Sequence, residues 1–238
     1  MKLKYAVRSS RRNLVAGFLS LVLVATPLLA GGRYLEPEHV DGIALLPAPP
    51  APDSAEQVAD LNSVRAVFKG RTPAEQAHAE ESATLSIYNF ASVIGDHFKK
   101  GRYPKLDVLM ETIKTNISQV INTPKDHWKR TRPYVIDPEL SLGKPEVSFS
   151  YPSGHSTRGT MQSLILAEVF PEQRQAILEN GRAIGWDRVI IGKHYPTDVN
   201  AGRVLGQAIF RELMKNPDFQ RDLAAAKAEV SALRAEKN

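Results

Sequence analysis

The stretch SYPSGHSTRGTMQSLILAEVF, residues 150–170, decides the fold class, because it joins a turn of small residues to an apolar run. The run predicts a helix over about 155–170. Pro152, Ser153 and Gly154 are poor helix formers, so helix propensity does not explain their position at its beginning. A helix N-terminus of small residues leaves backbone N–H groups free for an anion, and His155 could exchange a proton with the group that the anion is attached to. An isolated PSGH is more often only a turn and a helix cap, so the rest of the chain has to decide.

Helical patterns extend in both directions from this stretch. Leu106, Leu109 and Ile113 keep the three-to-four spacing of a helix that begins at Pro104, and Thr72-Pro73-Ala74-Glu75 predicts a capping box. No segment alternates as a β-strand would. The predicted helices cover about 54–69, 73–100, 104–120, 155–170, 172–191, 197–215 and 217–236, with a loop at 133–152. We therefore predict an all-α fold with a single helical domain over residues 53–238.

The first 30 residues predict a secretory signal peptide. Five basic and no acidic residues accompany the apolar run LVAGFLSLVLVATPLLA at 14–30. The whole chain has 31 Lys and Arg against 26 Asp and Glu, and removal of the leader leaves 26 of each. The positive charge belongs to the leader, so we expect no nucleic-acid partner. We expect a periplasmic or secreted protein, and SRRNLV at 10–15 leaves the twin-arginine export route open.

The segment after the leader predicts an extended arm. Residues 31–52 contain most of LLPAPPAPD, whose prolines exclude a regular helix. No second long apolar stretch follows, so we expect no membrane span in the mature form. The chain has no Cys, which excludes disulfides. A homo-oligomer stays open, because a long amphipathic helix can pack on its own domain or on a partner.

Three polar clusters carry the candidate chemistry: KDHWKRTRP at 125–133, PSGH at 152–155 and DRVIIGKHYPTD at 187–198. In the third, Pro196 favours a helix that begins near Thr197, so the Asp198 carboxylate can reach back to His194. A carboxylate on one ring nitrogen fixes the tautomer and leaves the other nitrogen free as a nucleophile. Taken alone, a His and an Asp four residues apart are more often a surface pair.

Cationic side chains occur in the first and third clusters. Lys125, Arg132 and Arg188, together with the PSGH turn, would form a pocket for a tetrahedral oxyanion. Taken singly, each is more often a solvated surface charge, and we expect Lys129 and Arg130 to be such charges.

The ordered set of motifs resembles the three-part signature of the type 2 phosphatidic acid phosphatase (PAP2) superfamily. The matching pattern is Lys125-x6-Arg132-Pro133, then PSGH, then Arg188-x5-His194-x3-Asp198. That superfamily includes bacterial class A nonspecific acid phosphatases and vanadium haloperoxidases. LLPAPPAPDS at 45–54 and NPDFQRDLAAAKAE at 216–229 are similar to the class A acid phosphatases, so the resemblance covers about residues 34–235.

The resemblance implies an all-helical acid phosphatase of broad specificity that acts on small phosphomonoesters without metal or cofactor. It makes His194 the nucleophile that forms a phosphohistidine, Asp198 its orienting partner and His155 the general acid. The implied phosphate-binding residues are Lys125, Arg132, Ser153, Gly154 and Arg188.

One residue departs from the family pattern. The third motif usually begins Ser-Arg, whereas this chain has Asp187-Arg188. An acid directed into the pocket would weaken anion binding, but neighbours on a helix diverge by roughly 100°, which would turn Asp187 away.

Other functions remain as alternatives. A vanadium-dependent haloperoxidase uses a similar pocket, and a soluble lipid phosphatase would act on headgroups. A phosphate-binding protein would need no nucleophile. A metal ion held by His155, His194 and Asp198 would be repelled by three nearby cations.

Overall fold

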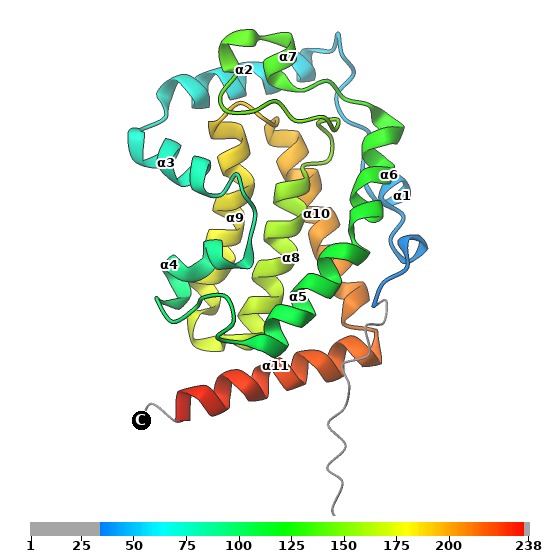
Figure 1. The fold of residues 1–238 in the computed structure, drawn as a ribbon. Coiled ribbons are helices and arrows are strands. Elements are labelled where there is room, and N and C mark those ends of the chain that lie inside the picture. Colours follow the sequence, from blue (N-terminus) through cyan, green and yellow to red (C-terminus); the bar gives the residue numbers. More distant parts are fainter. Residues whose placement is uncertain (1–33, 236–238) are drawn as a thin grey trace, which may run out of the picture. The chain divides into compact units, whose positions relative to one another are not determined.

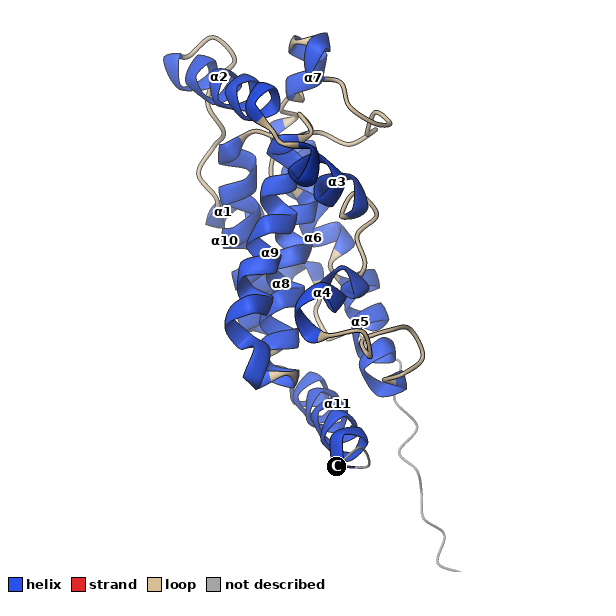
Figure 2. Ribbon diagram, turned by 90° about the vertical axis from the view of Figure 1, so that its left-hand side faces the viewer, coloured by secondary structure: helices blue, strands red, loops and turns tan. Residues whose placement is uncertain are grey.

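The computed structural model describes residues 34–235, which form helices joined by loops and contain no strand (Figure 2). This confirms the predicted all-α fold. The expected signal peptide lies outside the described residues, as do the first three residues of the expected arm and the last three of the chain.

Three long helices form the centre of the domain: α8 (Gly154–Val169), α9 (Arg174–Ile190) and α10 (Pro196–Leu213) (Figure 1). α8 and α10 begin at the end where α9 finishes. α11 (Pro217–Ala235) crosses the opposite end, and all four confirm the predicted helices. Two of the three motifs therefore meet at one end of the helical centre.

Small residues let α8 and α10 approach to backbone contact. A Cβ atom at Gly202 would lie 2.6 Å from the Ser153 carbonyl oxygen, and one at Gly206 would lie 2.5 Å from that of Thr157. Both distances are shorter than real Cβ contacts, so neither glycine can be replaced without a shift of a helix. The close packing fixes the beginning of α10 against the PSGH turn.

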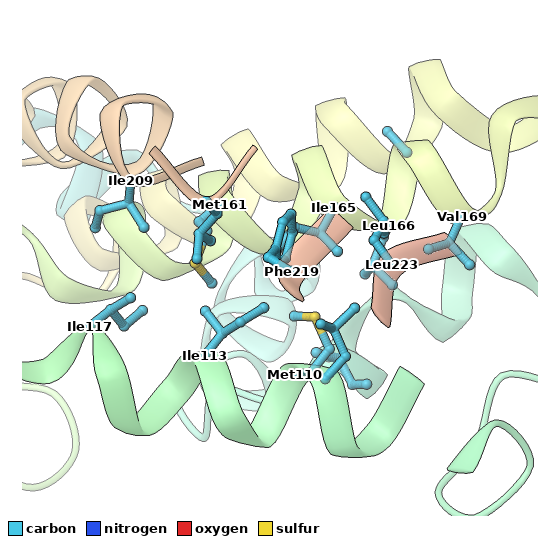
Figure 3. Packing of buried hydrophobic residues seen from close by; sticks show 14 of the residues in the cluster. Met110, Ile113, Ile117, Met161, Ile165, Leu166, Val169, Ile209, Phe219 and Leu223 are labelled. Carbon is cyan, nitrogen blue, oxygen red and sulfur yellow. The ribbon is translucent and has the colours of Figure 1, made fainter. Parts of the chain in front are cut away.

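The main core lies between these helices, α5 (Pro104–Asn116) and α11 (Figure 3). Met110 and Ile113 of α5 face Met161 of α8, with Phe219 of α11 beside them. Each such side chain contributes roughly 1.5–3 kcal/mol by leaving water. The three residues predicted to share one helix face are buried: Leu106, Leu109 and Ile113. Ile117 and Val120 are also buried. The helix predicted over 104–120 is divided at Ile117, and α6 (Ser118–Trp128) follows it.

The prediction of a single helix over 73–100 is wrong beyond Glu81. α3 (Pro73–Glu81) begins with the predicted capping box but ends before Ser82, whose hydroxyl donates to Asp187. A new capping box at Ser86 starts a 3-10 turn, Ile87–Phe90, which leads into α4 (Ala91–Ile94). α4 ends at Gly95, whose φ of 116° favours glycine. Side-chain bonds and one glycine thus interrupt a sequence that is apolar enough for a longer helix.

The outer segments combine predicted and unforeseen elements. α2 (Ala55–Gly70) begins as expected at Ser54, whose hydroxyl accepts a bond from the Gln57 amide. The arm includes a 3-10 turn, Pro37–His39, and α1 (Gly42–Leu45), whereas residues 46–50 have no helix. It is not wholly a surface extension, because Tyr34, Leu35, Val40 and Leu46 are buried. The loop at 133–152 contains α7 (Pro133–Ile136), which the sequence analysis did not separate.

We predict that Gly206→Ala lowers the free energy of unfolding by about 1–3 kcal/mol, because α8 and α10 must move apart to admit the methyl group. Gly70→Ala is the matched control, since a Cβ atom there meets nothing within 4 Å. Chemical denaturation of both variants measures the difference. Equal stability of the two would contradict the close packing of α8 on α10.

Candidate active site

The three motifs converge where α8 and α10 begin. The predicted residues lie as follows: Lys125 in the last turn of α6, Arg132 before α7, Ser153 at the cap of α8, Gly154 and His155 in its first turn, Arg188 near the end of α9, His194 in the following loop and Asp198 in the first turn of α10. The Ser153 amide donates to the Asp198 carbonyl oxygen at 3.0 Å, which ties the second motif to the third. Arg132 joins the first motif to the third through His194.

His194 is buried between an acidic side chain, Asp198, and a basic one, Arg132. Its Nδ1 lies 3.2 Å from Oδ2 of Asp198, and its Nε2 lies 3.1 Å from a terminal nitrogen of Arg132. A guanidinium can only donate, so Nε2 accepts and Nδ1 carries the proton. Both side chains of the His194–Asp198 pair are at most 1% exposed, so the surface-pair alternative is wrong.

The protonation state of His194 follows from its surroundings. Burial, followed by the charges of Arg132 and Lys125, holds its pKa well below the usual 6.5. The ring is therefore neutral, with a lone pair on Nε2 directed toward the cations. A neutral imidazole in this tautomer is the form that can attack phosphorus.

Arg130 is not the solvated charge that the sequence predicted. The side chain is buried and donates to Asp198 Oδ1 at 2.6 Å and to Asp60 Oδ2 at 2.8 Å. Its guanidinium also lies 3.9 Å from the ring centre of Tyr195. Lys129 is exposed, as expected. Arg130 precedes α7 in a segment without helical periodicity, and its acidic partners are distant in sequence, so no pattern marked it.

Ser150 is a second residue that the sequence analysis missed. Its hydroxyl donates to Asp198 Oδ2 at 2.5 Å, and the Tyr195 amide donates to the same oxygen at 3.0 Å. Asp198 therefore has partners on both carboxylate oxygens. The pair with His194 is one part of a larger buried network.

The three predicted cations are buried beside His194. Lys125, Arg132 and Arg188 are 2–3% exposed, so they are not solvated surface charges. Burial, followed by the charge of Arg132, lowers the pKa of Lys125 to about 7. The Lys125 amine donates to the Phe149 carbonyl oxygen at 2.5 Å. Burial and mutual repulsion make these three cations unfavourable on their own, so the cluster is suited to bind an anion.

Glu146 is the anion between two of these cations. Its carboxylate forms ion pairs with Arg132, at 2.7 Å, and with Arg188. Burial would raise the pKa of Glu146, but the two guanidinium groups outweigh it and lower the pKa to about 2. Nothing in the sequence distinguished this glutamate from other loop acids.

Two side chains of PSGH, those of His155 and Ser153, bind backbone groups of the protein. His155 Nε2 donates to the Ala83 carbonyl oxygen at 3.1 Å. Burial, and then the charge of Arg188, lowers the pKa of His155 to about 4, so it is neutral in this form. The Ser153 hydroxyl accepts a bond from the Ser156 amide at 3.3 Å and so caps α8. This agrees with the alternative that PSGH is a turn and a helix cap.

Asp187 is directed at α3 and its C-terminal cap, in agreement with the prediction that it would be turned away from the phosphate-binding residues. Its carboxylate accepts a bond from the Ser82 hydroxyl at 2.6 Å and lies 3.1 Å from His78 Nδ1. Ser82 precedes Ala83, whose carbonyl oxygen contacts His155. Asp187 therefore fixes the loop beside His155 instead of opposing the anion site.

Two further observations concern residues 34–235 alone. No three His, Cys, Asp or Glu side chains there are grouped closely enough to hold a metal ion, so His155, His194 and Asp198 do not form such a cluster. None of the helices in that part of the chain combines the length and apolar character needed to cross a membrane.

Comparison with known proteins gives the family. The model of the PAP2 superfamily matches residues 108–222. The non-specific acid phosphatase of Salmonella typhimurium is 31% identical over 210 residues, 82% of each chain. The acid phosphatase of Zymomonas mobilis is also 31% identical, over 92% of each chain. The chain belongs to the PAP2 superfamily.

A solved member of the PAP2 superfamily shares the fold. It is described as a transmembrane PAP2-type phosphatidylglycerolphosphate phosphatase from Bacillus subtilis. The match has a TM-score of 0.50 and 21% identity, and it covers 73% of this chain and 89% of that one. At this identity the likeness shows the fold alone.

We predict that Arg130→Lys lowers both stability and turnover of an aryl phosphate. Lysine keeps the charge but lacks the fork that reaches Asp60 and Asp198 together. The free energy of unfolding should fall by about 1–3 kcal/mol, and kcat by roughly tenfold or more as His194 loses its fixed position. Lys129→Ala, at the exposed neighbour, is the control and should match the unmodified protein. Equal behaviour of the two variants would mean that Arg130 does not position Asp198.

Proposed function

We propose that this PAP2 protein is a metal-independent acid phosphatase that hydrolyses phosphate monoesters of varied leaving groups through a phosphohistidine. The observation that carries the proposal is the buried, neutral His194, with Nδ1 held by Asp198 and Nε2 directed at a cluster of cations. The relatives named acid phosphatases, which match over most of the chain, support the same activity.

In the first step His194 attacks. The Nε2 lone pair forms a bond to phosphorus as the bond from phosphorus to the ester oxygen breaks. His155 gives its proton to the departing alkoxide, and Asp198 stabilises the positive charge that develops on the ring. The products are a free alcohol and a phosphohistidine.

In the second step water takes the place of the alcohol. His155, now neutral, accepts a proton from the water as its oxygen bonds to phosphorus and the bond to Nε2 breaks. Inorganic phosphate leaves, and His194 returns to its neutral form. No metal or cofactor enters either step.

The positive charge for both steps comes from side chains. Lys125, Arg132 and Arg188 would hold the phosphoryl oxygens, with the Ser153 hydroxyl and the Gly154 amide at the start of α8. The phosphoryl charge spreads over three oxygens, so fixed cations stabilise it in the transition state.

Substrate binding allows His155 to carry the proton that the first step needs. The pKa of His155 is about 4 in the structure because of burial and of Arg188. A phosphate anion beside the ring offsets the charge of Arg188 and raises that pKa in the complex. We therefore expect His155 to be charged when the anion is bound.

We also propose that residues 1–30 direct export, which would place the enzyme in the periplasm or outside the cell. The charged start and the apolar run of the leader support this.

We predict that the protein hydrolyses an aryl phosphate near pH 5.5 in the presence of EDTA, and that His194→Ala abolishes the activity. Loss of the nucleophile should reduce kcat by at least about 1,000-fold. His127→Ala is the control, because His127 lies in the first motif but is exposed.

Activity that requires added metal, or that survives in His194→Ala, would contradict the proposal. Vanadate separates the haloperoxidase alternative. It should inhibit phosphate release, and vanadate-dependent oxidation of halide by peroxide would support that alternative instead.

A further inference from the structure

We propose that Glu146 is a built-in competitor of the substrate, a carboxylate that occupies the phosphate site and must be displaced by every anion that binds there. The inference rests on the proposed function for the identity of the anion. It assigns to Glu146 the control of KM and of the release of inorganic phosphate.

Glu146 lies where two oxygens of a phosphoryl group would bind. One carboxylate oxygen of Glu146 lies 2.7 Å from a terminal nitrogen of Arg132, and the other bonds to a terminal nitrogen of Arg188. Arg132 comes from the start of α7 and Arg188 from α9, so a single carboxylate bridges two elements. Two oxygens of a phosphoryl group would take the same two positions, because guanidinium groups bind carboxylates and phosphates by the same donors.

Glu146 leaves some of the hydrogen-bond donors of Arg188 without a partner. Nε and one terminal nitrogen of Arg188 are buried without any hydrogen-bond partner among the described residues. Buried donors without a partner are costly, and a planar carboxylate has no third oxygen to offer them. A tetrahedral anion has further oxygens, so a substrate can gain contacts that Glu146 does not make.

The Glu146 side chain can leave the arginines without unfolding of its loop. The Tyr134 hydroxyl accepts a bond from the Glu146 amide at 3.0 Å and donates to the Glu146 carbonyl oxygen at 3.2 Å. The backbone is thereby anchored, while the side chain is 26% exposed and its neighbour Val147 is fully exposed. Rotation of the side chain toward solvent is enough to open the site.

The charges around Glu146 define when the competition acts. The groups that act on it electrostatically are Arg132, Arg188, Lys125, Lys193, His155 and His194. In place between the arginines, its pKa is about 2, as described above. Once displaced into solvent, the carboxyl regains an ordinary pKa of about 4.3. Displacement therefore becomes easier only below about pH 4.3, where the released carboxyl takes up a proton.

The consequence is uniform weakening of anion binding. Glu146 must leave before substrate, phosphate or vanadate enters, so it lowers each affinity by one common factor. Such a change alters KM and inhibition constants but leaves the bound transition state unaffected. Weak binding of phosphate also speeds product release.

The test is Glu146→Gln, which keeps the shape of the side chain but removes its charge. Glu139→Gln is the matched control, because Glu139 is an exposed acid in the same 133–152 loop. At pH 5.5, KM for an aryl phosphate and the inhibition constant of inorganic phosphate should both fall roughly tenfold in Glu146→Gln, with kcat within about threefold. At pH 3.5 the fall in both constants should be smaller than at pH 5.5. Glu139→Gln should lower neither constant.

A KM that stays the same or rises in Glu146→Gln, with a large loss of kcat, would overturn the proposal and make Glu146 a structural support of the arginines. Glu146→Ala provides a second variant and should show the same fall in both constants. Calorimetric titration with inorganic phosphate needs no turnover. Tighter phosphate binding in a protein without hydrolysis would contradict the proposed function but support the competition by Glu146.

Discussion

The buried carboxylate of Asp198 is the constraint on which the rest of the site depends. A charge in a protein interior is costly unless its lone pairs are satisfied. Here Arg130 takes one oxygen, and Ser150, the Tyr195 amide and His194 share the other. These partners come from the segment before α7, the segment before α8 and the start of α10. Arg130 also binds Asp60, so α2 is held by the same network.

This network explains why His194 can be both buried and reactive. Asp198 holds the proton on Nδ1, and burial, followed by the charges of Arg132 and Lys125, lowers the pKa of His194 so that a second proton does not bind. The same cations repel one another unless an anion lies between them. In the structure Glu146 supplies the negative charge, and in the proposed reaction the phosphoryl group does. Cation placement, nucleophile state and anion binding are thus parts of one electrostatic arrangement.

The sequence predicted what local spacing determines. The His194–Asp198 pair follows from Pro196 and one helical turn, and α8, α9, α10 and α11 follow from apolar periodicity. The end of α3 could not be predicted, because Ser82, where this helix stops, binds Asp187, a residue more than 100 positions away. Arg130 and Glu146 were missed for the same reason. Each is one charge among many in the sequence, and only the folded chain brings it beside Asp198 or between two arginines.

The central claim is that the Asp198 bond to Nδ1 leaves Nε2 of His194 as the attacking atom. The most direct measurement is a rapid quench of the enzyme during turnover of an aryl phosphate, followed by peptide mass spectrometry and phosphorus NMR under alkaline conditions, which preserve phosphohistidine. We expect a single phosphoryl group on Nε2 of His194. A phosphoryl group on Nδ1 or on another residue, or turnover without any phosphorylated protein, would contradict it.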